Sequence, residues 1–507
     1  MKTTGNNASW GSLKSACTNR SIVIFGASQY IYDIFSFAES ENVFVRGVVD
    51  NDFRKQGHIL RDIVGAIDAS IDDLVIKSPS VLSGIDPDSV VICIASVHYP
   101  EISRQLLEFG KFDCYAIPVL LQNEGHYNND ARNLVRELTC LPIQKNKIFI
   151  QMDFYGGHGK YITMALLNGN NSLDIVWAVR SSHKDLPEGV REVYQENRAE
   201  YYRELETAHI WIIDTYLPMD VVKKQGQVYI QVKHWSSITL KSFNMDEDKF
   251  RLSEECVGRA MSNAENMDYI LSGSSFDEAT CRSGFLFRGT FERVGSSRSD
   301  ILFDSSARHK VLQKLGLPDS RHYLLYAPTF RNEKQKTFST RFVWTGLDFT
   351  LLKQTLEQKF GGTWSVFLRL HPVVAIHSSE LDLPDFVIDA STYDDSQELV
   401  AASDILITDY SSIMFEPAFV KKPVFLYAPD RDTYVNEERQ LLLDYDELPF
   451  PIAVTNEELA DKISAFDEEQ YGKDLDAFFT KYDVHEDGHA SERAADFILG
   501  LIGERQG

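Results

Sequence analysis

Two short segments place phosphate-binding side chains at the ends of apolar runs of strand length. In the first, Arg369-Leu370-His371-Pro372, the run 364–370 leads into a guanidinium and an imidazole. Strand alternation puts Arg369 and His371 on the same side, so both can face one ligand. A guanidinium offers a rigid fork of N–H donors, and beside an imidazole it suits a phosphate or pyrophosphate. We therefore expect an anion site at this strand end.

The second segment follows the run 405–408. Thr408, Asp409, Ser411 and Ser412 stand where we expect this strand to lead into a helix that begins at Ser411. Free backbone N–H groups, hydroxyls and the positive end of the helix dipole would then converge on one spot, which favours an anion. The alternative is an ordinary helix cap made by Asp409 or Ser411.

A third run ends in Tyr-Ala-Pro-Thr-Phe-Arg at residues 326–331. Because parallel strands present their carboxyl ends at one edge of a sheet, Thr329 and Arg331 would add a hydroxyl and a guanidinium near the same ligand. We count both among the residues expected to bind this phosphate-containing ligand.

His234 could act as a general base. It follows the run 228–232, and Lys241 lies a few residues further on. A lone histidine more often has a structural role, but a strand-end position that faces an anion site favours a catalytic one.

Gly157 belongs to Gly-Gly-His-Gly-Lys at residues 156–160, which resembles a phosphate loop. The spacing of a Walker loop fails, because Phe154 occupies the place of the first glycine and Tyr161 follows the lysine. We interpret the segment, which includes Gly157, as a strand-to-helix turn that lines an inter-domain cleft. A plain tight turn is the alternative.

Apolar runs of strand length alternate with helix-length periodic segments in three blocks, which predicts an α/β fold with parallel sheets. The domains expected are 1–121, a Rossmann-like domain; 122–147, a helical linker; and two further Rossmann-like domains, 148–290 and 291–507. The strands expected are 21–25, 43–49, 89–95, 148–154, 175–179, 209–214, 228–232, 322–327, 364–370, 386–389, 405–408 and 424–427.

The first block has a weak dinucleotide fingerprint. Gly26 stands at its first strand-to-helix turn and an acidic residue, Asp50, follows its second strand, but the other two expected glycines are missing. A scaffold or regulatory domain is therefore favoured over a working nucleotide site.

Composition excludes several classes of protein. The 507 residues include 51 Lys and Arg against 75 Asp and Glu, a net charge of −24, and 43% of them are hydrophobic. This balance excludes a disordered chain and disfavours nucleic acid as a partner. The six cysteines form no C-x-x-C pair, which indicates a reducing compartment without structural zinc. The first 20 residues lack the apolar core of a signal peptide, and no run is long enough for a bilayer span.

Several of these motifs together resemble the bacterial CDP-glycerol glycerophosphotransferases, the teichoic-acid polymerases and primases. The likeness is carried by YAPTFR at 326–331, RLHP at 369–372 and SDILITDYSSIMFEP at 403–417. Gly295-Ser296-Ser297-Arg298-Ser299-Asp300 is similar to the family's G-x-P-R-x-D segment. The resemblance covers residues 148–498, about two thirds of the chain.

The resemblance implies a GT-B transferase of two facing Rossmann-like domains, here preceded by an additional N-terminal Rossmann-like domain. It also implies that 148–290 is the acceptor-side domain, with Gly157 and Lys241 on the acceptor side, and that 291–507 is the donor nucleotide domain. It also implies transfer of a polyol phosphate from a CDP-activated donor to a hydroxyl of a growing polymer, with release of CMP. His234 matches the family's catalytic base, and His371 and Arg369 match residues at the donor pyrophosphate. The phosphate-binding turn and its neighbours would be Thr408, Asp409, Ser411, Ser412, Thr329, Arg331 and Arg298.

Departures from the family pattern lie next to His234. Lys233 replaces a tryptophan of the Q-x-W-H-G segment, and Trp235 replaces its glycine. Ser297 also replaces the proline of G-x-P-R-x-D. Because the acceptor should enter beside His234, its identity is the least constrained part of the interpretation.

Two other functions stay open. Glu416 sits where sugar-nucleotide transferases of this architecture hold the donor ribose or sugar, so a GT-B glycosyltransferase is one alternative. A non-catalytic nucleotide-binding sensor is the other, because Lys233 and Trp235 could mark lost activity. We expect neither a metal nor another cofactor.

The family's acceptor is a membrane-anchored polymer or a lipid-linked primer, which implies a cytoplasmic protein held peripherally on the inner face of the bacterial membrane. Local cations could form the contact face, or they could simply be solvated lysines: Lys223, Lys224, Lys233, Lys241, Lys334, Lys336 and Arg341.

Overall fold

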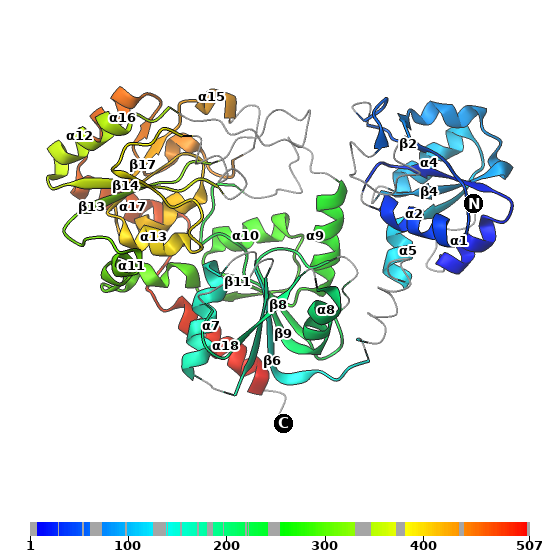
Figure 1. The fold of residues 1–507 in the computed structure, drawn as a ribbon, viewed down its shortest axis with the longest axis horizontal. Helices are drawn as coiled ribbons and strands as arrows, with labels where there is room; N and C mark the ends of the chain where they lie inside the picture. Colours follow the sequence, from blue (N-terminus) through cyan, green and yellow to red (C-terminus); the bar gives the residue numbers. More distant parts are fainter. Residues whose placement is uncertain are drawn as a thin grey trace. The chain divides into compact units, whose positions relative to one another are not determined.

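Three parallel sheets form the core of the computed structural model (Figure 1). The structure describes residues 8–28, 30–52, 55–60, 74–96, 99–124, 138, 140–152, 155–169, 172–179, 186–195, 197–218, 221, 223–241, 254–329, 346–371, 381–434 and 441–503. Most central strands are buried along their whole length, which explains why they read as continuous apolar runs.

The first sheet has the order β3-β2-β1-β4-β5. Its strands are β1 (Ser21–Phe25), β2 (Val45–Val49), β3 (Ile76–Lys77), β4 (Val90–Ile94) and β5 (Asp113–Ala116). Its helices are α1 (Trp10–Ala16), α2 (Ile31–Ser40), α4 (Tyr99–Phe109) and α5 (Ile117–Glu124). At the first turn, the amide of Ala27 donates to Asp50 (2.7 Å), and Lys55 pairs with the same carboxylate (3.2 Å).

The second sheet has the order β12-β11-β10-β9-β6-β7-β8. Its strands are β6 (Gln144–Gln151), β7 (Asp174–Val179), β8 (Val190–Tyr194), β9 (Ala208–Ile213), β10 (Val228–Gln231), β11 (Tyr269–Ser272) and β12 (Thr290–Arg293). Helices α7 (Gly157–Gly169), α8 (Arg198–Thr207), α9 (Glu254–Asn266) and α10 (Ser275–Gly284) alternate with them.

The third sheet has the order β15-β14-β13-β16-β17-β18. Its strands are β13 (His322–Tyr326), β14 (Trp364–Leu368), β15 (Val387–Asp389), β16 (Ile405–Thr408), β17 (Val424–Tyr427) and β18 (Ile452–Ala453). Its α-helices are α11 (Ala307–Leu315), α12 (Phe349–Phe360), α13 (Ser396–Ala402), α14 (Phe415–Phe419), α15 (Arg431–Thr433), α16 (Asn456–Ser464) and α17 (Glu468–Lys481). Short 3₁₀ turns are η3 (Ser297–Phe303), η5 (Ser412–Met414) and η7 (Tyr445–Glu447).

All three sheets share one connection pattern. Numbered within its own block, each has strand 1 between strands 2 and 4, the order of doubly wound nucleotide-binding sheets. Ligands of such sheets bind at the carboxyl ends of the strands, near the point where the order reverses. In the third sheet this point lies between β13 and β16.

The C-terminal helix α18 (Ala490–Gly503) departs from the expected division. It lies beside α7 (Figure 1), and its residues Ala494 and Ile498 share a core with Ile162 and Leu166 of that helix. Although we expected residues 291–507 to form the donor domain, this helix completes the core of the second sheet.

The chain folds as two compact units. One consists of Met1–Leu141, Leu217–Lys224 and Arg251–Glu265, and the other of Pro142–Tyr216, Gln225–Phe250 and Asn266–Gly507. The second unit contains both the second and the third sheet. The backbone amide of Leu217 donates to the side-chain oxygen of Asn263 (2.8 Å). This bond explains why the segments Leu217–Lys224 and Arg251–Glu265 belong to the same unit. Of the expected linker 122–147, residues 125–137 lie outside the described part, and β6 already begins at Gln144.

Candidate functional site

Thr408 and Asp409 join the ends of two neighbouring strands in the third sheet. The Thr408 hydroxyl is buried and donates to the carbonyl of Ala327 (2.6 Å). The Asp409 carboxylate accepts from the backbone amide of Thr329 (2.8 Å). These contacts fix the turns after β13 and β16. Thr408 and Asp409 therefore hold the shape of the expected anion site through side chains that are already hydrogen-bonded within the protein.

Ser411 and Ser412 differ in what they contact. The Ser412 hydroxyl bonds Thr239 (2.7 Å) and the backbone amide of Leu240 (3.0 Å), so it ties the loop after β10 to the third sheet. Ser411 is half-buried, and within the described part of the chain its hydroxyl makes no hydrogen bond. Ser411 is therefore the hydroxyl of this turn that is available to a ligand.

The helix expected to begin at Ser411 is shorter than predicted. A three-residue 3₁₀ turn, η5, comes first, and α14 then has only five residues. Pro417 lies inside this segment and cannot donate a backbone hydrogen bond. Since the macrodipole depends on aligned peptide groups, its contribution at this turn is smaller than we expected.

Arg369 and His371 follow β14, as predicted. The Arg369 guanidinium donates to the backbone carbonyls of Ala390 (3.3 Å) and Tyr393, and this fixes the loop before α13. His371 is exposed. Lost hydration, together with the charges of Lys241 and Arg369, lowers the pKa of His371 to about 4. The imidazole is therefore neutral at pH 7 and lies within the field of two cations.

Lys241, which we expected on the acceptor side, contacts residues of the third sheet. Its ammonium donates to the hydroxyl of Tyr434 (2.9 Å), and it influences His371. The loop carries it there because Ile238 and Leu240 are buried in the core of the third sheet. The backbone of Leu442 also bonds the carbonyl of Leu240 (2.8 Å).

The glycine-rich segment at 156–160 starts α7. Gly157 has a φ of 59°, a left-handed conformation that favours glycine. Lys160 does not point to a phosphate: it pairs with Asp395 (2.8 Å) and Glu398 (2.5 Å) of α13. Sequence reasoning missed this cluster, because nothing local distinguishes Lys160 or the two carboxylates from surface residues.

His234 stands alone at the surface of its segment. In the fully described residues 231–240, it is the one exposed residue and every other is buried. Its carbonyl accepts from the Arg298 guanidinium. The neighbouring carbonyl of Trp235 contacts His158 Nε2 (2.8 Å). Burial and the charges of Lys233 and Arg298 hold the pKa of His158 well below its usual value, so its neutral ring donates this bond.

Arg298 and Glu416, both expected to bind the donor, bind each other. The Arg298 Nε lies 3.0 Å from the Glu416 carboxylate, and the guanidinium also reaches the hydroxyl of Ser396 (3.4 Å). Glu416 is only 2% exposed and also accepts from Gln397. Burial raises the pKa of Glu416, and Arg298 opposes this. Arg298 thus connects the His234 loop to α13 and α14.

The structure therefore brings His234, Arg298, Arg369, His371 and Lys241 into one neighbourhood between the second and third sheets, with the carboxylates of Glu416 and Asp395 beside the arginines. Arg331 lies outside the described residues. Among described residues, no group of three His, Cys, Asp or Glu side chains is arranged to hold a metal ion. No helix in the described part is long and apolar enough to span a membrane.

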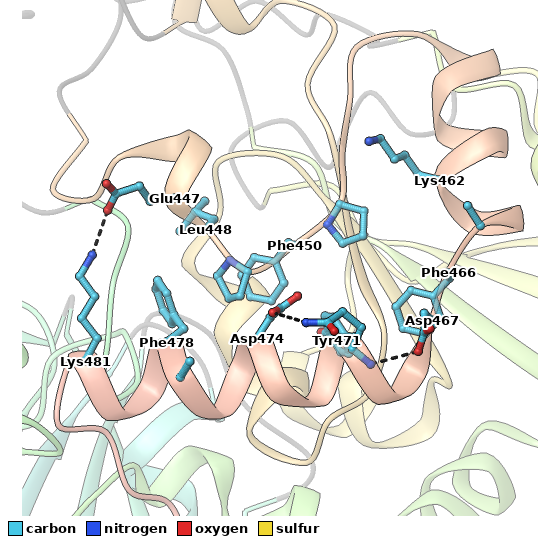
Figure 2. A pocket seen from close by; sticks show the side chains of 15 residues that line it. Glu447, Leu448, Phe450, Lys462, Phe466, Asp467, Tyr471, Asp474, Phe478 and Lys481 are labelled. Carbon is cyan, nitrogen blue, oxygen red and sulfur yellow. Dashed lines mark hydrogen bonds and ion pairs between the residues drawn. The ribbon is translucent and has the colours of Figure 1, made fainter.

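A pocket of about 630 Å³ lies elsewhere, between η7, α16 and α17 (Figure 2). Phe450, Phe466 and Phe478 line it, and ion pairs such as Lys481–Glu447 (2.9 Å) lie at its edge. None of the expected site residues borders it. Its carboxylates would repel a pyrophosphate, so we place the anion site at the strand ends instead.

Comparison with known proteins gives consistent matches. Residues 134–500 match the family described as CDP-glycerol:poly(glycerophosphate) glycerophosphotransferase. The teichoic acid poly(glycerol phosphate) polymerase of Staphylococcus epidermidis is 29% identical over 369 residues, which are 69% of this chain and 50% of that protein. The chain thus spans about half the length of that relative. The teichoic acid ribitol-phosphate primase of Bacillus spizizenii is 31% identical over 307 residues, 59% of this chain and 76% of that protein.

Solved structures extend the comparison to the fold. The structure of the wall teichoic acid polymerase TagF aligns with a TM-score of 0.64 at 24% identity, over 81% of this chain and 99% of that chain. The chain thus has an α/β, GT-B-like fold with parallel sheets.

Proposed function

Because the chain belongs to the CDP-glycerol:poly(glycerophosphate) glycerophosphotransferase family, we propose that it transfers a polyol phosphate from a CDP-activated donor. The polyol is glycerol or ribitol, and the acceptor is a hydroxyl of a teichoic-acid-like or capsular polymer or of a lipid-linked primer. CMP is the second product.

The observation that carries this proposal is the solvent exposure of His234. A single imidazole projects from an otherwise buried segment, and its carbonyl is bonded to Arg298 beside the cations of the third sheet. An exposed base next to an anion site is the arrangement that phosphoryl transfer to a hydroxyl requires. The match to the family supports the same assignment.

In the proposed reaction, the acceptor oxygen attacks the distal phosphorus of the donor. A new P–O bond forms to the acceptor, and the bond between the distal phosphorus and the bridging oxygen breaks. CMP leaves with the electron pair of that bond. His234 takes the proton of the acceptor hydroxyl, while Arg369, His371 and Ser411 stabilise the negative charge on the pyrophosphate.

The acceptor is membrane-anchored in this proposal, so the protein would lie peripherally on the inner face of the cell membrane. The structure leaves fewer of the candidate cations available to contact lipid. Lys233 is 1% exposed and cannot contribute, and Lys224 donates to the carbonyl of Leu141 (3.1 Å). Lys334, Lys336 and Arg341 lie outside the described residues.

The N-terminal block belongs to the proposal as a separate Rossmann-like domain with a scaffold or regulatory role. Its sheet order supports this assignment. The Asp50 carboxylate accepts the hydrogen bond from the backbone amide of Ala27, which a bound phosphate would otherwise accept. Lys55 neutralises the charge of this carboxylate. A working dinucleotide site is therefore disfavoured.

The test is CMP release by the full chain from CDP-glycerol, CDP-ribitol and a panel of UDP- and CMP-sugars, with and without an oligomeric or lipid-linked acceptor. Parallel reactions contain EDTA. We expect acceptor-dependent CMP from one CDP-polyol and its loss in His234→Ala, with donor binding retained. Turnover of a sugar nucleotide alone would establish the glycosyltransferase alternative. Nucleotide binding without any turnover would favour the sensor.

A further inference from the structure

The two residues that flank His234 donate to one buried carboxylate. Asp277 is fully buried in the first turn of α10. One of its oxygens accepts from the Trp235 indole (2.8 Å), and the other lies 3.0 Å from the Lys233 ammonium. Both oxygens of a single carboxylate are thus committed to the immediate neighbours of the exposed histidine.

The backbone at Lys233 adopts a conformation that needs such support. Its φ is 50°, in the left-handed region that costs a non-glycine residue about 1 kcal/mol or more. The side chain is almost completely buried, and its ammonium also donates to the carbonyl of Leu271 at β11 (3.1 Å). The Gln231 side chain accepts from the Lys233 amide (2.9 Å). The turn is therefore held from its side chain as well as from its backbone.

The carboxylate is itself fixed in place. Its second oxygen accepts from the amide of Gly273 (3.1 Å), and the Asp277 amide donates to the Ser274 hydroxyl that caps α10 (3.0 Å). The Trp235 ring also stacks on Phe285 at the end of α10 (centroids 5.7 Å apart). The start of α10 thus forms a rigid base below the His234 loop.

We propose that Asp277, acting through Lys233 and Trp235, is a positioning residue that sets the direction of the His234 imidazole. Lys233, Trp235 and Asp277 are called the clamp below. The proposal rests on the function proposed above for His234, and it assigns a purpose to the two departures from the family pattern: they supply the two donors that hold the loop.

A purely stabilising role explains the arrangement less well. A buried ion pair stabilises little after its desolvation cost, and apolar residues of similar size often replace one without loss. Stability alone would not require that both partners of Asp277 flank the single exposed residue of the segment. Positioning does require it, because a displacement of about 1 Å can cost about 100-fold in rate.

The test compares Lys233→Met and Trp235→Phe with a matched control, Lys147→Met. Lys147 is also a buried lysine of the second sheet, and it pairs with Glu204 (2.5 Å) away from the His234 loop. Trp235→Phe is the milder change, because it keeps an aromatic ring against Phe285 and removes one hydrogen bond. Each full-length variant is assayed for kcat and for the KM of the CDP-polyol that the wild type uses.

We expect kcat to fall about 100-fold in Lys233→Met and about 10-fold in Trp235→Phe, with the donor KM within about two-fold of the wild type. Lys147→Met loses thermal stability but keeps its kcat per folded molecule. Clamp variants whose kcat stays within two-fold of this control would overturn the proposal.

A second measurement separates the clamp from the proposed reaction. The NMR signal of the His234 imidazole, assigned by its absence in His234→Ala, is compared in the wild type and the three variants. We expect it to shift or broaden in Lys233→Met and Trp235→Phe and to stay unchanged in Lys147→Met. If no CDP-polyol is turned over, the proposed function fails, and an unchanged imidazole signal in both clamp variants would still reject the positioning role.

Discussion

The neutral state of His371 decides how this residue can take part in donor binding. Its pKa of about 4 results from lost hydration and from the nearby charges of Lys241 and Arg369. An anionic pyrophosphate would offset both cations and stabilise the imidazolium. Donor binding and proton uptake are then linked, so that each promotes the other.

This linkage predicts the pH dependence of donor affinity. Because the complex binds more protons than the free protein, affinity for a CDP-polyol rises as pH falls from 7.5 to 5.5, by about two- to ten-fold. His371→Gln keeps a hydrogen-bonding side chain but cannot titrate, so its affinity varies less with pH. Isothermal titration calorimetry in two buffers of different ionisation enthalpy measures the uptake directly. Equal proton uptake in the variant and the wild type would contradict the assignment.

The two serines of the 411–412 pair offer a matched comparison. Ser411→Ala removes the hydroxyl that has no bond within the described structure, so we expect weaker donor binding, by about five- to ten-fold, without loss of stability. Ser412→Ala removes the bond to Thr239 and Leu240, so it should lower stability by about 1 kcal/mol. Donor titration and thermal unfolding of both variants check this. An opposite pattern would mean that the anion lies on the other side of the turn.

Charged contacts between helices hold the second and third sheets together. Lys160 of α7 is bonded to Asp395 and Glu398 of α13, and Tyr161 donates to the same Asp395 (2.8 Å). All four side chains are largely removed from water. Because α13 also carries Ser396, which bonds Arg298, this cluster holds one wall of the site in place.

Lys160→Met is therefore expected to destabilise this unit strongly. It leaves two buried carboxylates near each other, with Lys314 (3.2 Å) and the Tyr393 hydroxyl still beside Glu398, at a cost of about 3 kcal/mol. Lys473→Met is the control, because its partner Glu469 is exposed and such a pair contributes about 0.5 kcal/mol or less. Urea unfolding followed by tryptophan fluorescence compares the two. A similar loss in both would show that the α7–α13 pairs contribute no more than surface pairs.

At the scale of the whole molecule, the short segment 295–300 contacts two distant parts of the chain, the His234 loop and the C-terminal helix α18. Arg298 reaches the His234 carbonyl and Glu416, while Asp300 accepts from the amides of Ala490 (3.1 Å) and Ser491 (2.6 Å). Asp300 thus caps α18, the C-terminal helix that returns to α7. The C-terminal helix is thus held by the same turn that contacts the His234 loop.

Asp300→Ala should consequently loosen α18 and cost about 1–2 kcal/mol. Hydrogen–deuterium exchange should accelerate in α18 and in α7, against which it packs. Thr455→Ala is the matched control, since Thr455 caps α16 through the amide of Glu458 (3.1 Å), and α16 packs in a different core cluster from α18. Faster exchange confined to α16 is expected there. Unchanged exchange of α18 in Asp300→Ala would contradict the capping role.

Much of the third sheet could be predicted because its strands are buried. The runs 405–408 and 424–427 coincide with β16 and β17, since a parallel strand covered on both faces is apolar throughout. β6 begins earlier than predicted, at Gln144, because its first residues are polar and exposed. The proximity of Arg369 to His371 also followed from sequence, because the two residues end the same strand. The convergence of Ser411 on the same ligand stays a prediction.

By itself, the sequence determined the α/β class, the main strands, the residues at their carboxyl ends and the family. These depend on local periodicity and on short motifs. Only the tertiary structure decided the partners of each charged group: Lys160 meets Asp395 across 235 positions, and Trp235 meets Asp277 across 42. It also paired Lys241 with Tyr434 and Arg298 with Glu416. The physical reason is that a buried charge must be paired, and which partner is available depends on how distant segments pack.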